Sequence, residues 1–251
     1  MATVSELLDE LFGLNTSDKN KTTSTLDEIL NANSVLKMNE NSDLIADEVL
    51  ILARTKMNNQ HVCVGGYSLQ QKRYVRLLTF NEHYLNETEP YQVGEVYEIT
   101  YQGRQNIVLP HSEDVCVLDS HLRSRLARQQ LLGLISEICV HDDIHIRDLF
   151  DGKLCWEHGS GFLMQTGQIT QYSVMIARLN HDLFLYDSHG SVKFRYIDNG
   201  SIFSVKYVGV GNINSRKIPM GRYLRFSLAR WWDNNGCYPT KRAYLQLSGI
   251  Y

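Results

Sequence analysis

The sequence has few cysteines, no pair of closely spaced cysteines and no long apolar segment. The five cysteines, Cys63, Cys116, Cys139, Cys155 and Cys237, form no Cys-x-x-Cys motif of the kind found in zinc sites and redox proteins. We therefore expect reduced thiols. The chain lacks both a run of about 18 apolar residues and a secretory signal at its start. These absences predict a soluble, cytoplasmic protein without membrane contact.

Motifs of the common catalytic classes are also missing. There is no Gly-x-Gly-x-x-Gly before a helix, no phosphate-binding loop and no Gly-x-Ser-x-Gly. The one dense group of metal-ligand residue types, at 139–145 with Cys155 and His158, fits no zinc spacing. We therefore assign no catalytic residue, no metal and no cofactor, and the sequence favours a non-catalytic protein.

The formal net charge of -3 hides an uneven distribution. Residues 1–48 hold ten of the 28 acidic residues and three of the 25 basic ones, so residues 49–251 carry a net charge of +4. This acidic leader contains two short helical patterns, Leu7–Phe12 and Leu26–Leu30, each preceded by a Ser or Thr at N-cap distance. The leader is either a disordered arm or a segment that binds a protein partner.

From Val49 onward the pattern changes to short strand-like segments. VLILAR, HVCVGGY, RYVRLL, GEVYEITY and DVCVL predict a first small β-barrel over 49–119. The segment SHLRSRLARQQLLGLI predicts an amphipathic bridging helix over 120–133. VMIARL, LFLYDS, VKFRYI, RYLRFSLARWW and AYLQLSG predict a second barrel over 134–251. The expected fold is mainly β, with two consecutive small OB-like barrels joined by a helix.

Two of these strands carry a tyrosine and an arginine two residues apart. Tyr74 and Arg76 share one face of an extended strand, as do Tyr223 and Arg225. An aromatic ring beside a guanidinium can stack a base and attract its phosphate. We predict single-stranded DNA or RNA as the partner of these faces. The alternative for each pair is a cation–π contact that covers the sheet and binds nothing.

Other basic residues extend this candidate site. Those predicted to contact nucleic acid are Arg54, Lys56, Arg230, Lys241 and Arg242. Arg230 precedes the tandem Trp231 and Trp232, of which at most one can face solvent, because adjacent strand residues point in opposite directions. The exposed tryptophan would add a stacking surface.

The segment Pro110–Asp114, with the sequence PHSED, places a histidine beside two carboxylates. Such a group could perform acid–base chemistry, although no nucleophile lies at a recognisable offset. One interpretation is a structural turn, and another is a nucleotide-processing enzyme centred on His111, Glu113 and Asp114. A third function class stays open, in which the barrels form a scaffold and the leader recruits an effector as an adaptor.

Several blocks of the sequence resemble a known family. VLILARTKMNNQHVCVGGYSLQQKRYVRLL, VGEVYEI, LPHSEDV, RYLRFSLARWW and AYLQLSGIY, in this order over 49–251, resemble the dual OB-containing domain, a prokaryotic family often linked with anti-phage and other conflict systems. The resemblance implies two consecutive OB-type barrels that engage nucleic acid, without an established reaction or cofactor. It leads us to expect an accessory protein of a prokaryotic defence system. The positions that match the family are Ala53, Arg54, Lys56, Cys63, Gly65, Arg76, Leu77, His111, Glu113, Asp114, Arg225, Ser227, Leu228, Arg230, Gln246, Ser248 and Tyr251.

Overall fold

A computed structural model describes residues 44–57, 60–188, 190–211, 213 and 215–251. Within these residues the fold is mainly β, as predicted. The two helical patterns of the acidic leader fall within residues 1–43, which lie outside the described residues. The protein partner predicted for this leader therefore stays a prediction. In the part that is described, none of the helices has the length and apolarity needed to span a membrane.

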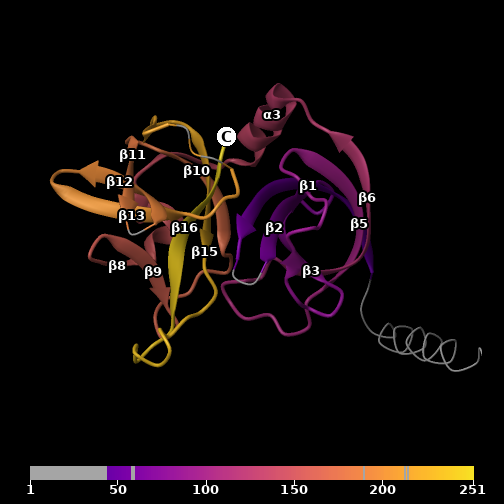
Figure 1. Ribbon diagram of the computed structural model, residues 1–251, viewed down its shortest axis with the longest axis horizontal. Helices are drawn as coiled ribbons and strands as arrows, with labels where there is room; N and C mark the ends of the chain where they lie inside the picture. Colours follow the sequence, from indigo (N-terminus) through magenta and orange to yellow (C-terminus); the bar gives the residue numbers. More distant parts are fainter. Residues whose placement is uncertain (1–43, 58–59, 189, 212, 214) are drawn as a thin grey trace, which may run out of the picture. The chain divides into compact units, whose positions relative to one another are not determined.

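The first barrel contains five strands in a closed ring and one short additional strand (Figure 1). Its strands are β1 (Ile45–Lys56), β2 (His61–Ser68), β3 (Arg73–Thr79), β4 (Leu85–Asn86), β5 (Glu95–Gly103) and β6 (Asp114–Arg125). The ring runs β1-β2-β3-β6-β5 and returns to β1, and every pairing is antiparallel except β3 with β6. The short β4 pairs with β2.

The apolar run at the start of the first barrel has a structural explanation. Val49 and Ile51 of β1 face the barrel interior, whereas Leu50 and Leu52 belong to a separate apolar cluster outside it. Both faces of β1 are therefore buried, which is why its sequence VLILA does not alternate with polar residues.

The second barrel has the same ring order but more additions. Its elements are β7 (His141–Ile144), the 3-10 helix η1 (Ile146–Gly152), β8 (Cys155–Glu157), β9 (Ser160–Met164), β10 (Val174–Leu179), β11 (Leu183–Ser188), β12 (Ser191–Asp198), β13 (Ser201–Tyr207), β14 (Lys217–Ile218), β15 (Tyr223–Leu228) and β16 (Arg242–Ile250). The ring runs from β10 through the continuing segment β11 to β12, β13, β16 and β15, and back to β10. The parallel pair β13–β16 corresponds to β3–β6 of the first barrel.

The repeated pentapeptides RYVRL and RYLRF do not occupy equivalent strands. The first lies in β3, which is the third strand of its ring and pairs in parallel with β6. The second enters β15, the fourth strand of its ring, which pairs antiparallel with β10 and β16. The similarity of the two pentapeptides therefore does not reflect duplication of one strand.

The predicted helix over 120–133 is wrong in its first part. Residues Ser120–Arg125 continue β6 and pair with β5, so backbone hydrogen bonds to a neighbouring strand outweigh a weak amphipathic pattern. Helix α3 (Arg128–Ile138) follows, and the side-chain oxygen of Gln130 accepts a hydrogen bond from the backbone N–H of Ala127 at its start (2.9 Å). The prediction of a helix between the two barrels is confirmed for Arg128–Ile138.

Helix α3 packs against an apolar layer that both barrels share, which we call the seam. Its buried members are Leu50, Leu52, Val96, Ile135, Ile176 and Tyr251. The hydroxyl of Tyr251 donates to the carbonyl oxygen of Leu52 (2.6 Å), and the hydroxyl of Tyr223 donates to Ser136 of α3 (2.9 Å). The two barrels therefore share one buried interface.

This continuity predicts that the barrels unfold together. Ile135 is fully buried, so Ile135→Ala is expected to lower the free energy of unfolding by about 2–5 kcal/mol, and Ile135→Val by about 0.5–1.5 kcal/mol. All three tryptophans, Trp156, Trp231 and Trp232, belong to the second barrel. Tryptophan fluorescence therefore reports mainly on that barrel and on the contact of Trp231 with Leu109, while circular dichroism follows both barrels. Coincident urea transitions by the two signals are expected, and separate midpoints would contradict a shared seam.

Candidate nucleic-acid interface

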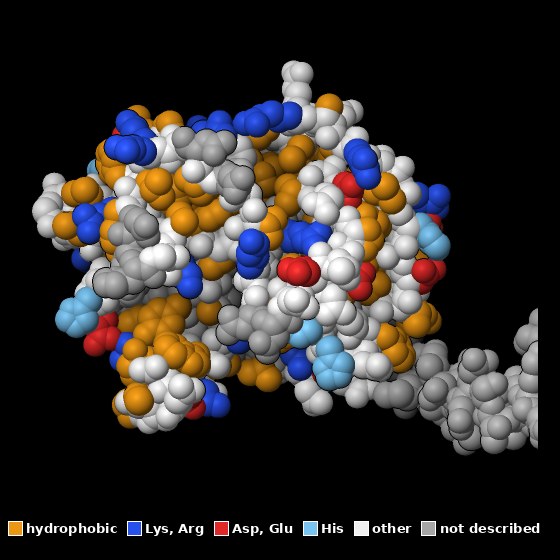
Figure 2. Space-filling view, in the orientation of Figure 1, with side chains coloured by type: hydrophobic (Ala, Val, Ile, Leu, Met, Phe, Trp, Pro, Cys, Tyr) orange, Lys and Arg blue, Asp and Glu red, His pale blue; other side chains and the backbone are white. Residues whose placement is uncertain are grey.

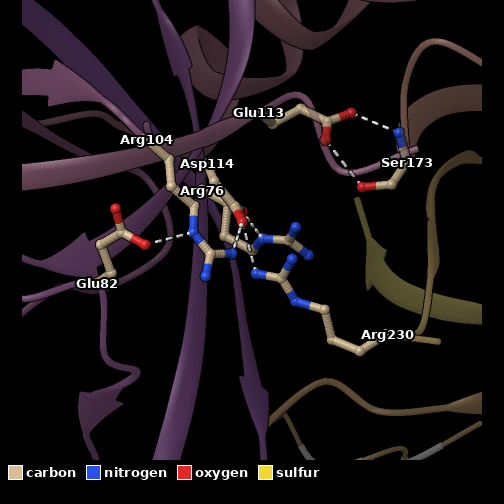
Figure 3. A network of polar contacts seen from close by, with 7 residues as sticks. All are labelled: Arg76, Glu82, Arg104, Glu113, Asp114, Ser173 and Arg230. Carbon is tan, nitrogen blue, oxygen red and sulfur yellow. Dashed lines mark hydrogen bonds and ion pairs between the residues drawn. The ribbon is translucent and has the colours of Figure 1, made fainter. Parts of the chain in front are cut away.

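A single buried carboxylate, that of Asp114, holds three arginines together (Figure 3). Oδ1 of Asp114 accepts from Nε of Arg76 (2.5 Å), its neighbour in the β3–β6 register. Oδ2 accepts from Nη2 of Arg230 (2.7 Å) and from Nη1 of Arg104 (3.0 Å). Arg230 belongs to the second barrel, so this cluster ties the two barrels by charge as well as by apolar contact.

The arginines keep Asp114 ionised although it is buried. Burial alone raises the pKa of a carboxyl group, but the guanidiniums of Arg76 and Arg230 outweigh it and hold the pKa of Asp114 below its ordinary value of 3.8. Arg104 has a second carboxylate partner in Glu82 (2.9 Å). Three guanidiniums thus share two carboxylates, and the cluster carries a net positive charge.

The loop before Asp114 is held against the second barrel by hydrogen bonds. The two oxygens of Glu113 accept from the backbone N–H (2.5 Å) and the hydroxyl (2.8 Å) of Ser173. The indole N–H of Trp231 donates to the carbonyl oxygen of Leu109 (2.7 Å). Both carboxylates of the PHSED segment are therefore engaged in contacts that hold the barrels together, as expected of a structural turn.

His111 of the same segment is poorly suited to acid–base catalysis. It is buried, and burial, followed by the charges of Arg76 and Arg230, lowers the pKa of its imidazole to about 2. A base with so low a pKa stays neutral at physiological pH. The geometry gives no support to an enzyme centred on this turn. Over the described ranges, no group of three or more His, Cys, Asp or Glu residues is placed to hold a metal ion.

Arg225 of β15 is a second buried arginine, beside Arg76, at the contact between the two barrels. Its Nη1 donates to the hydroxyl of Ser248 (2.8 Å), and its guanidinium lies against Gly65 of β2. A Cβ atom on Gly65 would stand 2.2 Å from Nη2 of Arg225, so only glycine leaves room for the guanidinium there. Because Gly65 is the register partner of Arg76 on β3, this contact brings the two predicted arginines to one place.

Arg76 and Arg225 line a cavity of about 340 Å³ between the barrels, which we call the seam pocket. Its lining residues are Thr55, Lys56, Met57, Cys63, Arg76, Tyr84, Val174, Lys206, Val208, Arg225, Ser227, Leu228, Ala229, Arg230 and Gln246. Five of them are basic and none is acidic. The seam pocket is therefore suited to an anion.

A second hollow of about 550 Å³, which we call the barrel groove, continues from the seam pocket over the second barrel. Its lining residues are Ser160, Gly161, Lys193, Ser204, Lys206, Ala229, Trp232, Tyr244, Leu245 and Gln246, again without a carboxylate. Lys206, Ala229 and Gln246 belong to both hollows. In Figure 2 hydrophobic side chains gather beside the β15–β16 loop at the lower left, and Lys and Arg side chains lie over this face, including its middle.

The two Tyr-x-Arg pairs do not form exposed faces, although the predicted binding of nucleic acid to these strand faces would require exposure. Arg76 is 7% exposed and Arg225 is 3% exposed, while Tyr74 and Tyr223 pack as half-buried rings against the seam. The reason is tertiary, because the faces that carry these residues are the ones through which the barrels meet. The arginines still reach a cavity, but the tyrosines do not line it.

The other predicted residues divide between structural contacts and the two hollows. Nη1 of Arg54 donates to the backbone oxygens of Glu89 and Tyr91 (both 3.0 Å), so Arg54 holds a loop. Lys56 is exposed and Arg230 half-buried, and both line the seam pocket.

Lys241 and Arg242 lie outside both hollows. Lys241 is exposed and lines neither of them. Arg242 stacks between Phe162 (4.3 Å) and Tyr238 (4.2 Å) and pairs with Glu157. Arg242 therefore stabilises the aromatic side of the barrel groove without facing into it.

The tandem tryptophans behave as predicted. Trp231 packs against the core of the second barrel, whereas Trp232 is 46% exposed and lines the barrel groove. Sequence reasoning missed Lys206 and Tyr244. Both could have been found from strand alternation, since Lys206 follows buried Val205 in β13 and Tyr244 stands between two buried residues of β16.

Two consecutive five-stranded rings of OB type, with a basic cavity between them, place this chain among dual-barrel proteins. The chain belongs to the dual OB-containing domain family, whose model matches residues 47–250. The resemblance found in the sequence is thereby confirmed. No protein of curated function matches the chain in sequence.

Solved structures with some likeness include HIN domains. The Ifi202 HINa domain in complex with a 20-base-pair dsDNA is 13% identical, with a TM-score of 0.32, and the match covers 82% of this chain and 100% of that one. A murine DNA-binding protein bound with dsDNA is 9% identical, with a TM-score of 0.29, and the match covers 82% of this chain and 99% of that one. At these TM-scores the likeness carries no argument about the ligand of this chain.

The charge cluster predicts a pH-dependent loss of stability in Asp114→Asn. At pH 7 the variant leaves buried guanidiniums without their carboxylate, and its free energy of unfolding is expected to be about 3–5 kcal/mol lower. Because the folded-state pKa of Asp114 is depressed, the carboxylate stabilises the protein above its ordinary pKa, and this stabilisation is lost as the pH falls. The gap between wild type and variant should therefore narrow as the pH falls below the ordinary value of 3.8.

Urea unfolding from pH 7 to pH 3 measures the gap. Asp119→Asn is the matched control, since Asp119 is exposed and, among the described residues, pairs with His121 and the adjacent backbone. Its effect is expected to stay below about 1 kcal/mol. A gap for Asp114→Asn that is constant from pH 7 to pH 3 would count against the assigned role of Asp114.

Proposed function

We propose that this protein binds single-stranded nucleic acid along the barrel groove, as a non-catalytic accessory protein of a prokaryotic defence system. The observation that carries the proposal is one carboxylate-free groove in which the rings of Trp232 and Tyr244 lie together with Lys193 and Lys206. Family membership supports it, since OB-type barrels commonly bind oligonucleotides on this part of the fold. The association of the family with conflict systems supports the defence role.

The aromatic side of the groove provides a stacking surface. Trp232 and Tyr244 lie with their ring centroids 6.2 Å apart, and Tyr244 contacts Phe162 behind it (5.4 Å). These contacts hold the rings in place before a ligand arrives. Stacking of a base on such a ring is worth about 1–3 kcal/mol and tolerates any sequence, because every base has a flat π face.

The basic side of the groove contains an unfavourable pair of charges. Lys193 of β12 and Lys206 of β13 are direct register partners in an antiparallel pair. Like charges in this position destabilise a sheet, and neither lysine has a carboxylate partner within the described residues. A bound phosphate backbone would relieve this repulsion, which supports a polyanionic ligand.

The proposal predicts a loss of affinity in Trp232→Ala. Removal of the exposed ring is expected to weaken the binding of a short single-stranded oligonucleotide by about 5–150-fold, which corresponds to one lost stacking contact. Fluorescence anisotropy with labelled single-stranded DNA and RNA of equal length measures the effect. Binding of neither nucleic acid to the wild type at low salt would refute the proposed function, since phosphate contacts are strongest there.

A second prediction concerns the salt dependence of binding. The double variant Lys193→Gln with Lys206→Gln removes two phosphate contacts, so the slope of log K against log salt is expected to become less negative by about 1.4. Lys72→Gln, at an exposed turn of the first barrel, is the control and should leave the slope unchanged. An equal change of the slope per removed lysine in the double variant and in the control would mean that binding depends on the overall charge of the protein. It would contradict binding along the barrel groove.

A further inference from the structure

The seam pocket contains more positive charge than its surroundings neutralise. Arg76, Arg104 and Arg230 share the carboxylates of Asp114 and Glu82. Arg225 has no carboxylate within ion-pair distance among the residues that the structure describes, and its guanidinium donates to the hydroxyl of Ser248. Buried charges without partners are costly. The charge of buried Glu113 also acts on Arg76, so four guanidiniums face three carboxylates, and Lys56 and Lys206 add two cations. The pocket therefore keeps a net positive charge that a ligand could neutralise.

Donor groups inside the pocket are also without partners. Nη2 of Arg76 and Nε of Arg225 are buried and make no hydrogen bond. Buried polar groups in proteins are nearly always paired, and those that are not mark a strained or functional site. Arginine has five N–H donors in a planar fork, which suits the oxygens of a phosphate. Two such forks, each with one buried donor that has no partner among the described residues, therefore lie at the wall of one cavity.

The backbone at Gly65 allows the guanidiniums of Arg76 and Arg225 to lie close together in the seam pocket. Gly65 stands opposite Arg76 in the β2–β3 register and contacts the guanidinium of Arg225 from the other barrel. Any side chain at this position would push Arg225 away. The convergence of two arginines, one from each barrel, is therefore permitted by one residue without a Cβ atom.

An aromatic ring and three further cations complete the pocket. Tyr84 is half-buried, lines the cavity and lies with its ring centroid 6.0 Å from the guanidinium of Arg230. Lys56 and Lys206, both exposed, line the cavity with Arg230. A phosphate held by Arg76 and Arg225 would thus lie in the same cavity as a ring on which a base can stack.

We propose that the seam pocket binds the phosphomonoester of a nucleotide, either free or at the end of a nucleic acid strand. A dianionic phosphomonoester would neutralise the net positive charge of the arginines and lysines that line the pocket. An internal phosphodiester carries one charge and has a nucleotide on each side, whereas Arg76 and Arg225 are almost fully buried and accept only a group that enters the cavity. The volume of about 340 Å³ lies at the small end of ligand pockets, roughly 300–1,000 Å³.

The two sources of the ligand have different relations to the barrel groove. Binding of a strand end rests on the proposed function, because the seam pocket and the groove share Lys206, Ala229 and Gln246. Binding of a free nucleotide does not depend on the groove. Both sources use the same phosphate chemistry, so the experiment must separate them.

The test compares phosphorylated and unphosphorylated ligands on the full-length wild-type chain. One arm titrates one oligonucleotide sequence with a 5′-phosphate, a 3′-phosphate or hydroxyl ends, and the other titrates AMP, adenosine and inorganic phosphate, all by calorimetry at low salt. We expect at least tenfold tighter binding of a phosphorylated strand end over hydroxyl ends, or of AMP over both adenosine and inorganic phosphate. The arm that shows the preference identifies the source.

Variants connect this preference to the named residues. Arg225→Met removes an uncompensated buried charge and keeps an apolar chain of similar length, so it should abolish the preference for phosphate without lowering the stability of the unliganded protein. Lys56→Gln, at an exposed position, should reduce the preference several-fold and does not disturb the core. Lys72→Gln is the matched control and should leave it unchanged.

Two results would overturn the proposal. Equal binding of phosphorylated and hydroxyl-ended strands, together with no binding of AMP, would exclude a phosphomonoester site. Inorganic phosphate that binds as tightly as AMP, together with equal binding of phosphorylated and hydroxyl-ended strands, would exclude recognition of the nucleotide. In either case the binding of the hydroxyl-ended strand still reports on the barrel groove, so failure of the pocket and failure of the proposed function can be told apart.

Discussion

The charge on Asp114 is the constraint on which the meeting of the two barrels depends. One buried carboxylate accepts from arginines of both barrels, and its neighbours Glu113 and Leu109 accept hydrogen bonds from the second barrel. Both acidic side chains of the PHSED segment are therefore engaged in contacts between the barrels. Burial of such a charge cluster lowers the stability of the fold unless each charge is paired. The packing of the two barrels must therefore hold Asp114 and its arginines at hydrogen-bond distance.

The same seam explains why the basic residues of this chain have such different surroundings. Where strands of the two barrels face each other, Arg76 and Arg225 are removed from solvent and converge on a cavity. Where the second barrel faces outward, Lys193, Lys206 and Trp232 stay accessible in the barrel groove. A nucleic acid strand in the groove and a phosphate in the pocket would use continuous surface, because the two hollows share lining residues.

Strand alternation and turn residues were sufficient to predict a mainly β fold, two barrels and a helix between them, since these follow from local periodicity. The helix boundary was wrong because residues Ser120–Arg125 pair with β5, and a strand partner distant in sequence leaves no local signal. The opposite behaviour of Trp231 and Trp232 was predictable from local geometry, because adjacent residues of an extended chain point to opposite sides. The two residues lie beyond β15, where Trp232 forms an isolated bridge with Arg242.

By itself the sequence determined the strand content, the order of the two barrels, the family and the positively charged body, all of which depend on composition and spacing. Only the tertiary structure decided which basic residues remain exposed. The Tyr-x-Arg faces look available in an isolated strand, but burial of apolar area between the barrels covers them. Whether an arginine binds a ligand or a neighbouring carboxylate depends on residues such as Asp114, Gly65 and Ser248, which the fold brings to it.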